Sequence, residues 1–109
     1  MSVRLYILQR VTALILLPMI IVHVAVIFYA TRNGLTAAEI LERTRGSLSW
    51  GLYYGTFVVA ASIHGAIGVR NVLVEWSPAP ARLASVGSAA IGALLIVLGF
   101  RAVAAVVLA

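Results

Sequence analysis

The residue with the clearest chemical potential is a histidine inside a long apolar stretch. His64 is followed at helical spacing by Gly68, Asn71 and Glu75, so all four lie on one face of a helix. Neutral imidazole is a good axial ligand for haem iron, and Gly68 leaves room beside it for a flat, bulky ligand. The alternative is a hydrogen bond to a neighbouring helix. Because an ionisable group deep in lipid is usually functional, we expect His64 to bind haem.

A second histidine, His23, lies in the first apolar stretch. His23 is 13 residues after Arg10, which is a distance of about 19 Å along a helix. His64 is 11 residues before Glu75, which is a distance of about 16 Å along a helix. If Arg10 and Glu75 mark the same membrane interface, the two histidines lie at similar depths. They could then flank one haem, serve two haems with partner chains, or have unrelated roles. Packing or hydrogen bonding is the simpler expectation for His23.

Two polar clusters lie toward what we expect to be the same side of the membrane. They comprise Tyr6, Gln9 and Arg10 in the first apolar stretch, and Arg70, Asn71, Glu75 and Trp76 at the end of the second. Both could border a pocket for a molecule with a polar head and an apolar tail, such as a quinone. The alternative is that the arginines only anchor the topology. Arg70 lies about 120° from the His64 face, so it reaches a haem propionate only through its long side chain, or contacts a neighbouring subunit.

The composition predicts an all-α integral membrane protein. The chain has 109 residues, is 63% hydrophobic and 10% charged, and has a mean hydropathy of +1.12. We expect one domain, residues 1–109, with membrane helices at about 5–30, 50–75 and 82–107. Thr36 and Glu39 have the spacing of a capping box and predict a short interfacial helix between the first and second spans, ending near Arg43.

The same composition excludes several classes of function. The net charge is +5, but all eight basic residues are arginines scattered between apolar stretches, which argues against nucleic-acid binding. The absence of cysteine excludes disulfides and iron–sulfur ligands from this chain. There is no phosphate-binding loop, no nucleophile beside a base and no carboxylate pair, so we expect no stand-alone enzyme.

Two other classes of membrane protein remain as alternatives. A small transporter or channel subunit would usually need a carboxylate within the membrane, and all three glutamates lie in loops or at a helix end. A cofactor-free assembly subunit is the other alternative. The polar loop with two glutamates favours the outside for that loop, and therefore a cytoplasmic N-terminus.

Two motifs resemble those of the succinate dehydrogenase and fumarate reductase (complex II) membrane anchors of the cytochrome b556 type. The segment from Leu8 to Ala13, Leu-Gln-Arg-Val-Thr-Ala, resembles the (H/Q)-R-x-(S/T) signature of their first helix. The segment from His64 to Arg70, followed by Glu75, resembles H-x-x-x-G-x-R-x-x-x-x-(D/E) in their second helix. Length and the three-helix layout agree, so the resemblance covers the whole chain.

The resemblance implies a function for the chain and roles for single residues. In that family two anchor chains hold a flavoprotein and an iron–sulfur subunit on the cytoplasmic face of a bacterial inner membrane, and electrons pass to ubiquinone or menaquinone. His64 matches the haem b ligand, and Arg10 the quinone-site arginine. Tyr6 stands where many members carry a serine near the quinone. Glu75 and Trp76 match an acidic residue and an aromatic near the same pocket. His23 is similar to the first-helix histidines of the two-haem branch, which bind the outer haem.

Overall fold

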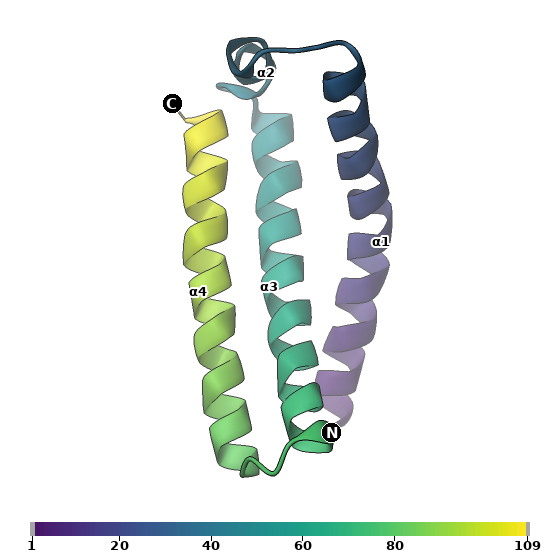
Figure 1. Ribbon diagram of the computed structural model, residues 1–109, viewed down its shortest axis with the longest axis vertical. Coiled ribbons are helices and arrows are strands. Elements are labelled where there is room, and N and C mark those ends of the chain that lie inside the picture. Colours follow the sequence, from purple (N-terminus) through teal and green to yellow (C-terminus); the bar gives the residue numbers. More distant parts are fainter. Residues whose placement is uncertain (1, 109) are drawn as a thin grey trace.

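The computed structural model describes residues 2–108, which form four helices and no strand (Figure 1). The long helices are α1 (Val3–Arg32), α3 (Leu48–Trp76) and α4 (Ala81–Val107). The short helix α2 (Ala37–Thr44) lies between the first two. This all-helical fold, with three candidate membrane spans and a short helix after the first, confirms the predicted fold class. The spans are up to two residues longer at each end than the hydropathy pattern predicts.

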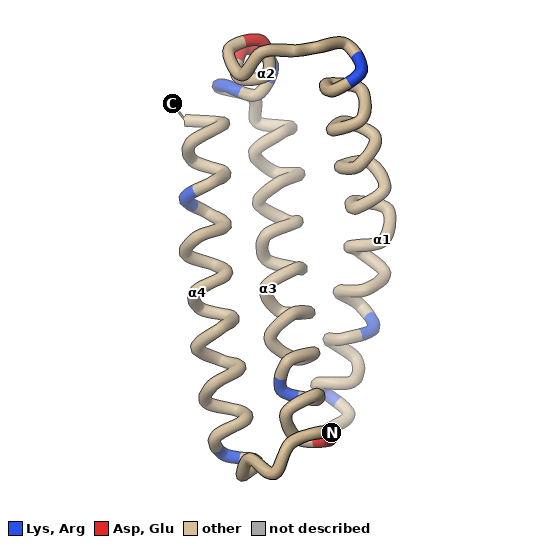
Figure 2. The backbone as a smooth tube through the Cα atoms, viewed as in Figure 1, with Lys and Arg blue, Asp and Glu red and all other residues tan. Residues whose placement is uncertain are grey.

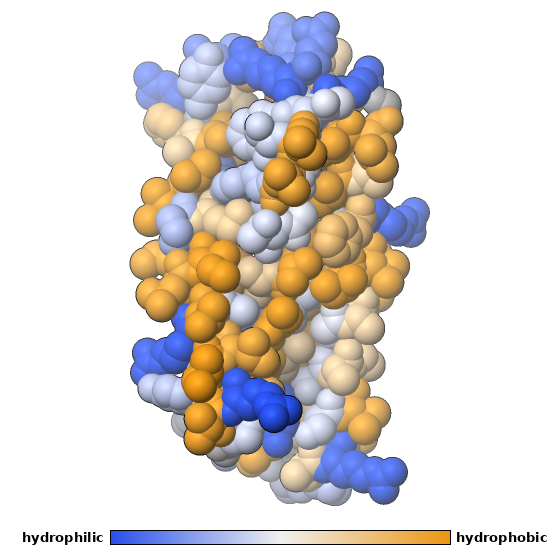
Figure 3. Space-filling model, turned by 180° about the vertical axis from the view of Figure 1, so that it is seen from behind, coloured by the Kyte–Doolittle hydropathy of each residue, from blue (hydrophilic) through white to orange (hydrophobic). Residues whose placement is uncertain are grey.

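The three long helices are apolar over most of their surface. They contain 30, 29 and 27 residues, which exceeds the roughly 20 residues needed to cross the hydrocarbon of a bilayer. Most charged residues lie toward the two ends of the bundle, with Arg10 on α1 and Arg101 on α4 about two turns inside (Figure 2). The surface between them is mostly apolar (Figure 3). This layering is the one that a bilayer requires of a multi-pass helical protein.

Side chains cap three of the helices at their N-termini. The Ser2 hydroxyl accepts a hydrogen bond from the backbone N–H of Leu5 at 3.2 Å, and the Ser47 hydroxyl accepts from Trp50 at 3.2 Å. Thr36 and Glu39 form the predicted capping box: Glu39 N–H donates to Thr36 Oγ1 at 3.2 Å, and Thr36 N–H donates to the Glu39 carboxylate at 2.9 Å.

Helix α2 is fastened to the last turn of α4. The Thr44 hydroxyl donates to the carbonyl of Val106 at 2.7 Å, and Gly46 N–H donates to the carbonyl of Val107 at 2.7 Å. These carbonyls have no partner within a helix that ends there. Gly46 has φ +71°, a conformation that glycine adopts without steric cost. The loop therefore closes one end of the bundle.

Helix α3 lies between α1 and α4 (Figure 1) and packs most closely against α4. A Cβ added at Gly92 would lie 3.0 Å from the Cβ of Ala66, and one added at Gly99 would overlap the side chain of Val58. The fully buried Ala84 and the buried Ser88 continue this small-residue contact toward the start of α4. Small residues let the two backbones approach closely, as is common where helices associate within lipid.

We predict that Gly99→Ala lowers the stability of the bundle by about 1–3 kcal/mol, because the new methyl group has to push α4 away from Val58. Gly87→Ala is the matched control, because a Cβ at this position meets nothing within 4 Å. This variant should change the stability only through the gain in helix propensity of alanine over glycine. Thermal unfolding of the two variants in detergent measures the difference. Equal melting temperatures would contradict the close contact at Gly99.

Candidate functional site

The side chain of His64 on α3 is held by a hydrogen bond to the neighbouring helix α1. Its Nδ1 lies 3.1 Å from the hydroxyl oxygen of Thr12. Thr12 is one of the few buried residues, with 4% of its surface exposed. A polar pair between two apolar helices fixes both their rotation and their stagger, because an unpaired polar group in lipid is costly.

The environment of Thr12 also determines which ring nitrogen of His64 carries the proton. A threonine hydroxyl has one proton to donate and two lone pairs to accept with. The Thr12 hydroxyl donates to the backbone carbonyl of Leu8 at 2.7 Å, with the carbonyl of Gln9 at 3.1 Å as a second acceptor. With its proton given to a backbone carbonyl, the Thr12 oxygen is left to accept, an arrangement that puts the hydrogen of His64 on Nδ1. In a neutral ring this leaves Nε2 with a free lone pair.

A shallow groove runs along α3 beside the imidazole. It has a volume of about 390 Å³ and its lining is formed by His64, Gly65, Gly68, Val69, Val72 and Leu73. A Cβ at Gly68 would lie 3.6 Å from the Gln9 amide nitrogen, an ordinary contact, so packing within this chain does not require glycine there. Gly68 lines the groove and adds no side chain to it. The lone pair of an imidazole beside an apolar groove fits an axial haem ligand.

Arg10 and Tyr6 form a separate pair on an exposed part of α1. The Arg10 Nε donates to the Tyr6 hydroxyl at 3.2 Å, and the guanidinium carbon lies 5.2 Å from the centre of the Tyr6 ring. Tyr6 is 48% exposed. Neither residue lines the groove at His64, so this pair faces outward, toward lipid or another chain.

The polar residues at the end of α3 point to different places. The Arg70 Nε donates to the Ser85 hydroxyl on α4 at 3.0 Å. Glu75 and Trp76 are exposed at the end of the helix, and Trp76 is 82% exposed. The structure thus places Arg10, Arg70 and Glu75 in three different surroundings, and none of them lines the groove beside His64.

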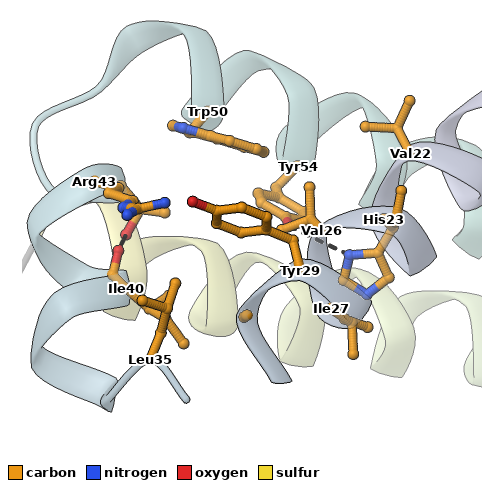
Figure 4. A pocket seen from close by; sticks show the side chains of 13 residues that line it. Val22, His23, Val26, Ile27, Tyr29, Leu35, Ile40, Arg43, Trp50 and Tyr54 are labelled. Carbon is orange, nitrogen blue, oxygen red and sulfur yellow. Dashed lines mark hydrogen bonds between the residues drawn. The ribbon is translucent and has the colours of Figure 1, made fainter. Parts of the chain in front are cut away.

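His23 lies in the half of α1 nearer α2, beside an aromatic cluster. Its Nδ1 is 3.3 Å from the Tyr54 hydroxyl, and its ring makes edge contacts with Tyr54 and Phe57, with centroids 5.7 and 5.5 Å apart. His23 lines an apolar cavity of about 520 Å³ between α1, α2 and α3 (Figure 4). It contributes nothing to the groove at His64.

The two histidines do not lie at similar depths, so the prediction made from Arg10 and Glu75 is wrong. Thr12 is level with His64, and His23 is 11 residues beyond Thr12 on α1, about 16 Å along the axis. Axial ligands of one haem bond to the same iron, so His23 and His64 cannot share it. That prediction assumed that Arg10 and Glu75 lie at the same depth. Arg10 is instead nearly level with Gly68, because its neighbour Gln9 lies beside Gly68, and Glu75 lies two turns further along α3.

Sequence reasoning placed Gln9 in the polar cluster with Arg10, and Thr12 only within a helix motif, and it assigned neither residue to the site at His64. Thr12 and Gln9 are spaced three residues apart in an apolar stretch, and both face α3, at His64 and Gly68 respectively. The Oε1 of Gln9 is the only buried side-chain nitrogen or oxygen without a hydrogen-bond partner within residues 2–108. The spacing of two polar residues on one face of an apolar helix was the signal that could have identified them.

The described residues contain no group of three or more His, Cys, Asp or Glu side chains that could hold a metal ion. Any metal chemistry at His64 therefore needs a prosthetic group or ligands from another chain. Together, fold and site define a multi-pass α-helical membrane protein that presents one histidine beside an open groove.

Comparison with known protein families agrees with this class. The model of the succinate dehydrogenase/fumarate reductase transmembrane subunit family matches residues 1–108, and the chain belongs to this family. No curated protein and no solved structure matches it. The resemblance of the two helix motifs is thereby confirmed, and a membrane anchor role follows from the family.

Proposed function

We propose that this chain is an anchor subunit of a succinate:quinone oxidoreductase and that Nε2 of His64 is an axial ligand of haem b. The observation that supports the ligand is the Thr12 hydrogen bond, which holds the proton on Nδ1 and leaves the other nitrogen as a lone pair. A bound haem would supply one-electron chemistry. The second axial ligand comes from the second anchor subunit, because within residues 2–108 the other histidine is too distant.

The proposed quinone site lies on the N-terminal side of the bundle and is completed by another chain. Arg10 and Tyr6 on α1, and Glu75 and Trp76 at the end of α3, are all exposed there and available to a partner. An arginine at this site would favour the reduced, partly anionic quinone. Arg70 as a contact of a haem propionate stays a prediction, since its Nε already donates to Ser85.

The proposed partners are an iron–sulfur subunit, a flavoprotein and the second anchor subunit. Succinate would be oxidised in the flavoprotein, and electrons would reach quinone through the complex. We propose the bacterial inner membrane as the location, with the N-terminus and the soluble subunits on the cytoplasmic side. Ubiquinone and menaquinone both fit these residues.

We predict that His64→Ala abolishes b-type absorbance in the purified, dithionite-reduced complex, because the iron loses its ligand from this chain. His23→Ala is the control on α1. If the haem content of this control is unchanged, His64 is the only haem ligand that this chain supplies. A loss of about half of the haem would show that His23 binds a second haem, a role that stays a prediction. A His64→Ala complex that keeps the full spectrum would refute the proposed ligand.

We further predict that Thr12→Val keeps the haem but raises its midpoint potential. The hydrogen bond from Nδ1 makes the imidazole a stronger donor, which stabilises ferric iron, and valine removes the acceptor while keeping the shape. Thr12→Ser restores the hydroxyl and should return the potential toward that of the wild type. Redox titration of the b-type band measures both variants. Equal potentials in all three proteins would show that Thr12 only packs against the ring.

A further inference from the structure

A second cavity opens between α1, α2 and α3 at the end of the bundle that carries α2 (Figure 4). Its volume is about 520 Å³, and most of its lining is aliphatic or aromatic. It lies at the opposite end of α1 from Thr12, so it is separate from the groove at His64. An apolar space of this size does not stay filled with water, and within a bilayer an amphipathic molecule would occupy it.

The deep end of the cavity offers little to a polar ligand. His23 Nδ1 and the Tyr54 hydroxyl lie there and are hydrogen-bonded to each other at 3.3 Å. The single buried side-chain oxygen without a partner within residues 2–108 belongs to Gln9, which does not line this space. Apart from the second ring nitrogen of His23, a quinone ring at this depth would meet mostly aliphatic and aromatic side chains. The depth therefore suits a hydrocarbon chain.

The mouth of the cavity, in contrast, carries a positive charge. The guanidinium carbon of Arg43 lies 5.6 Å from the centre of the Tyr29 ring, and Trp50 lies beside them (Figure 4). Arg43 forms no ion pair within the described residues. Its neighbour one turn back, Glu39, is engaged in capping the backbone of Thr36 at 2.9 Å. A cation over an aromatic ring at the rim of an apolar cavity is complementary to an anionic headgroup.

We propose that this cavity binds an anionic phospholipid, with its phosphate at Arg43 and one acyl chain lying between α1 and α3 toward His23. The order of groups along the cavity carries the assignment. The charge is at the mouth, and the spacing of six positions along α1 from Tyr29 back to His23 gives an apolar depth of about 9 Å. A phospholipid has this same order of charge and hydrocarbon. The lipid would fill the space between α1 and α3 and so hold the half of α1 nearer α2 in place.

Lipid analysis of the purified complex, with all of its co-purifying subunits, tests the headgroup contact. The complex is washed extensively in a mild detergent, and the retained lipids are extracted and quantified by mass spectrometry. We expect the wild type to retain an anionic phospholipid, and Arg43→Gln to retain about fivefold less, which corresponds to ~1 kcal/mol for one arginine near an anionic surface. Arg45→Gln is the matched control, because Arg45 is exposed on the same segment and does not line the cavity.

A second pair of variants tests the acyl chain without touching the charge. Ala30→Phe places a ring in the cavity from α1 and should displace the lipid, whereas Val24→Phe adds the same ring at a position that is 57% exposed and outside the lining. Haem absorbance should be unchanged in all four variants, so the result is independent of the proposed haem ligand. Retention of an isoprenoid quinone or of only zwitterionic lipid, equal retention in every variant, or a partner helix seated in the cavity would each overturn the proposal.

Discussion

The hydrogen bond between Thr12 and His64 sets both the position of α1 and the chemistry of the imidazole. Helices within lipid gain nothing from the hydrophobic effect when they meet, so close packing and polar contacts decide how they associate. Thr12 and His64 form the polar contact between α1 and α3 near the N-terminal end. The same bond places the hydrogen on Nδ1, because Thr12 gives its own proton to the backbone of its helix. The same hydrogen bond thus accounts for the arrangement of α1 on α3 and for the tautomer of the His64 ring.

The rest of the bundle is open. The buried hydrophobic residues of the described chain are Leu16, Ala60, Ile67 and Ala84, and two of these are alanines. So few buried side chains cannot form the core of an independent domain. The contact between α3 and α4 relies on glycines instead, and α1 is joined to α3 by side-chain contacts at Thr12, Met19 and His23. Stability must therefore come from lipid and from other subunits, as expected for a family whose members are transmembrane subunits of a larger complex.

The hydropathy pattern was sufficient to predict the spans and the capping box at Thr36, because both depend on residues close together in sequence. The choice of His64 followed from one face of one helix. The relative depth of His23 and His64 could not be predicted, because it depends on the stagger between α1 and α3. That stagger is set by contacts between side chains on different helices. The positions of charged residues near the helix ends were a poor guide to it. The turn of Arg70 toward Ser85 is another contact between helices that no local pattern encodes.

The two histidines show how similar contacts lead to different chemistry. Each has Nδ1 near a hydroxyl, but the Thr12 hydroxyl has a backbone acceptor for its proton, whereas His23 is the only partner of the Tyr54 hydroxyl within residues 2–108. Tyr54 is therefore free to donate to Nδ1 of His23, which would leave the proton on Nε2 and no lone pair for a metal. The Thr12 hydroxyl, whose proton goes to the backbone of its own helix, leaves His64 the tautomer that a metal ligand needs. The Tyr54 hydroxyl has kept its proton and can donate it to His23, so the His23 ring would present an N–H and no lone pair at its second nitrogen.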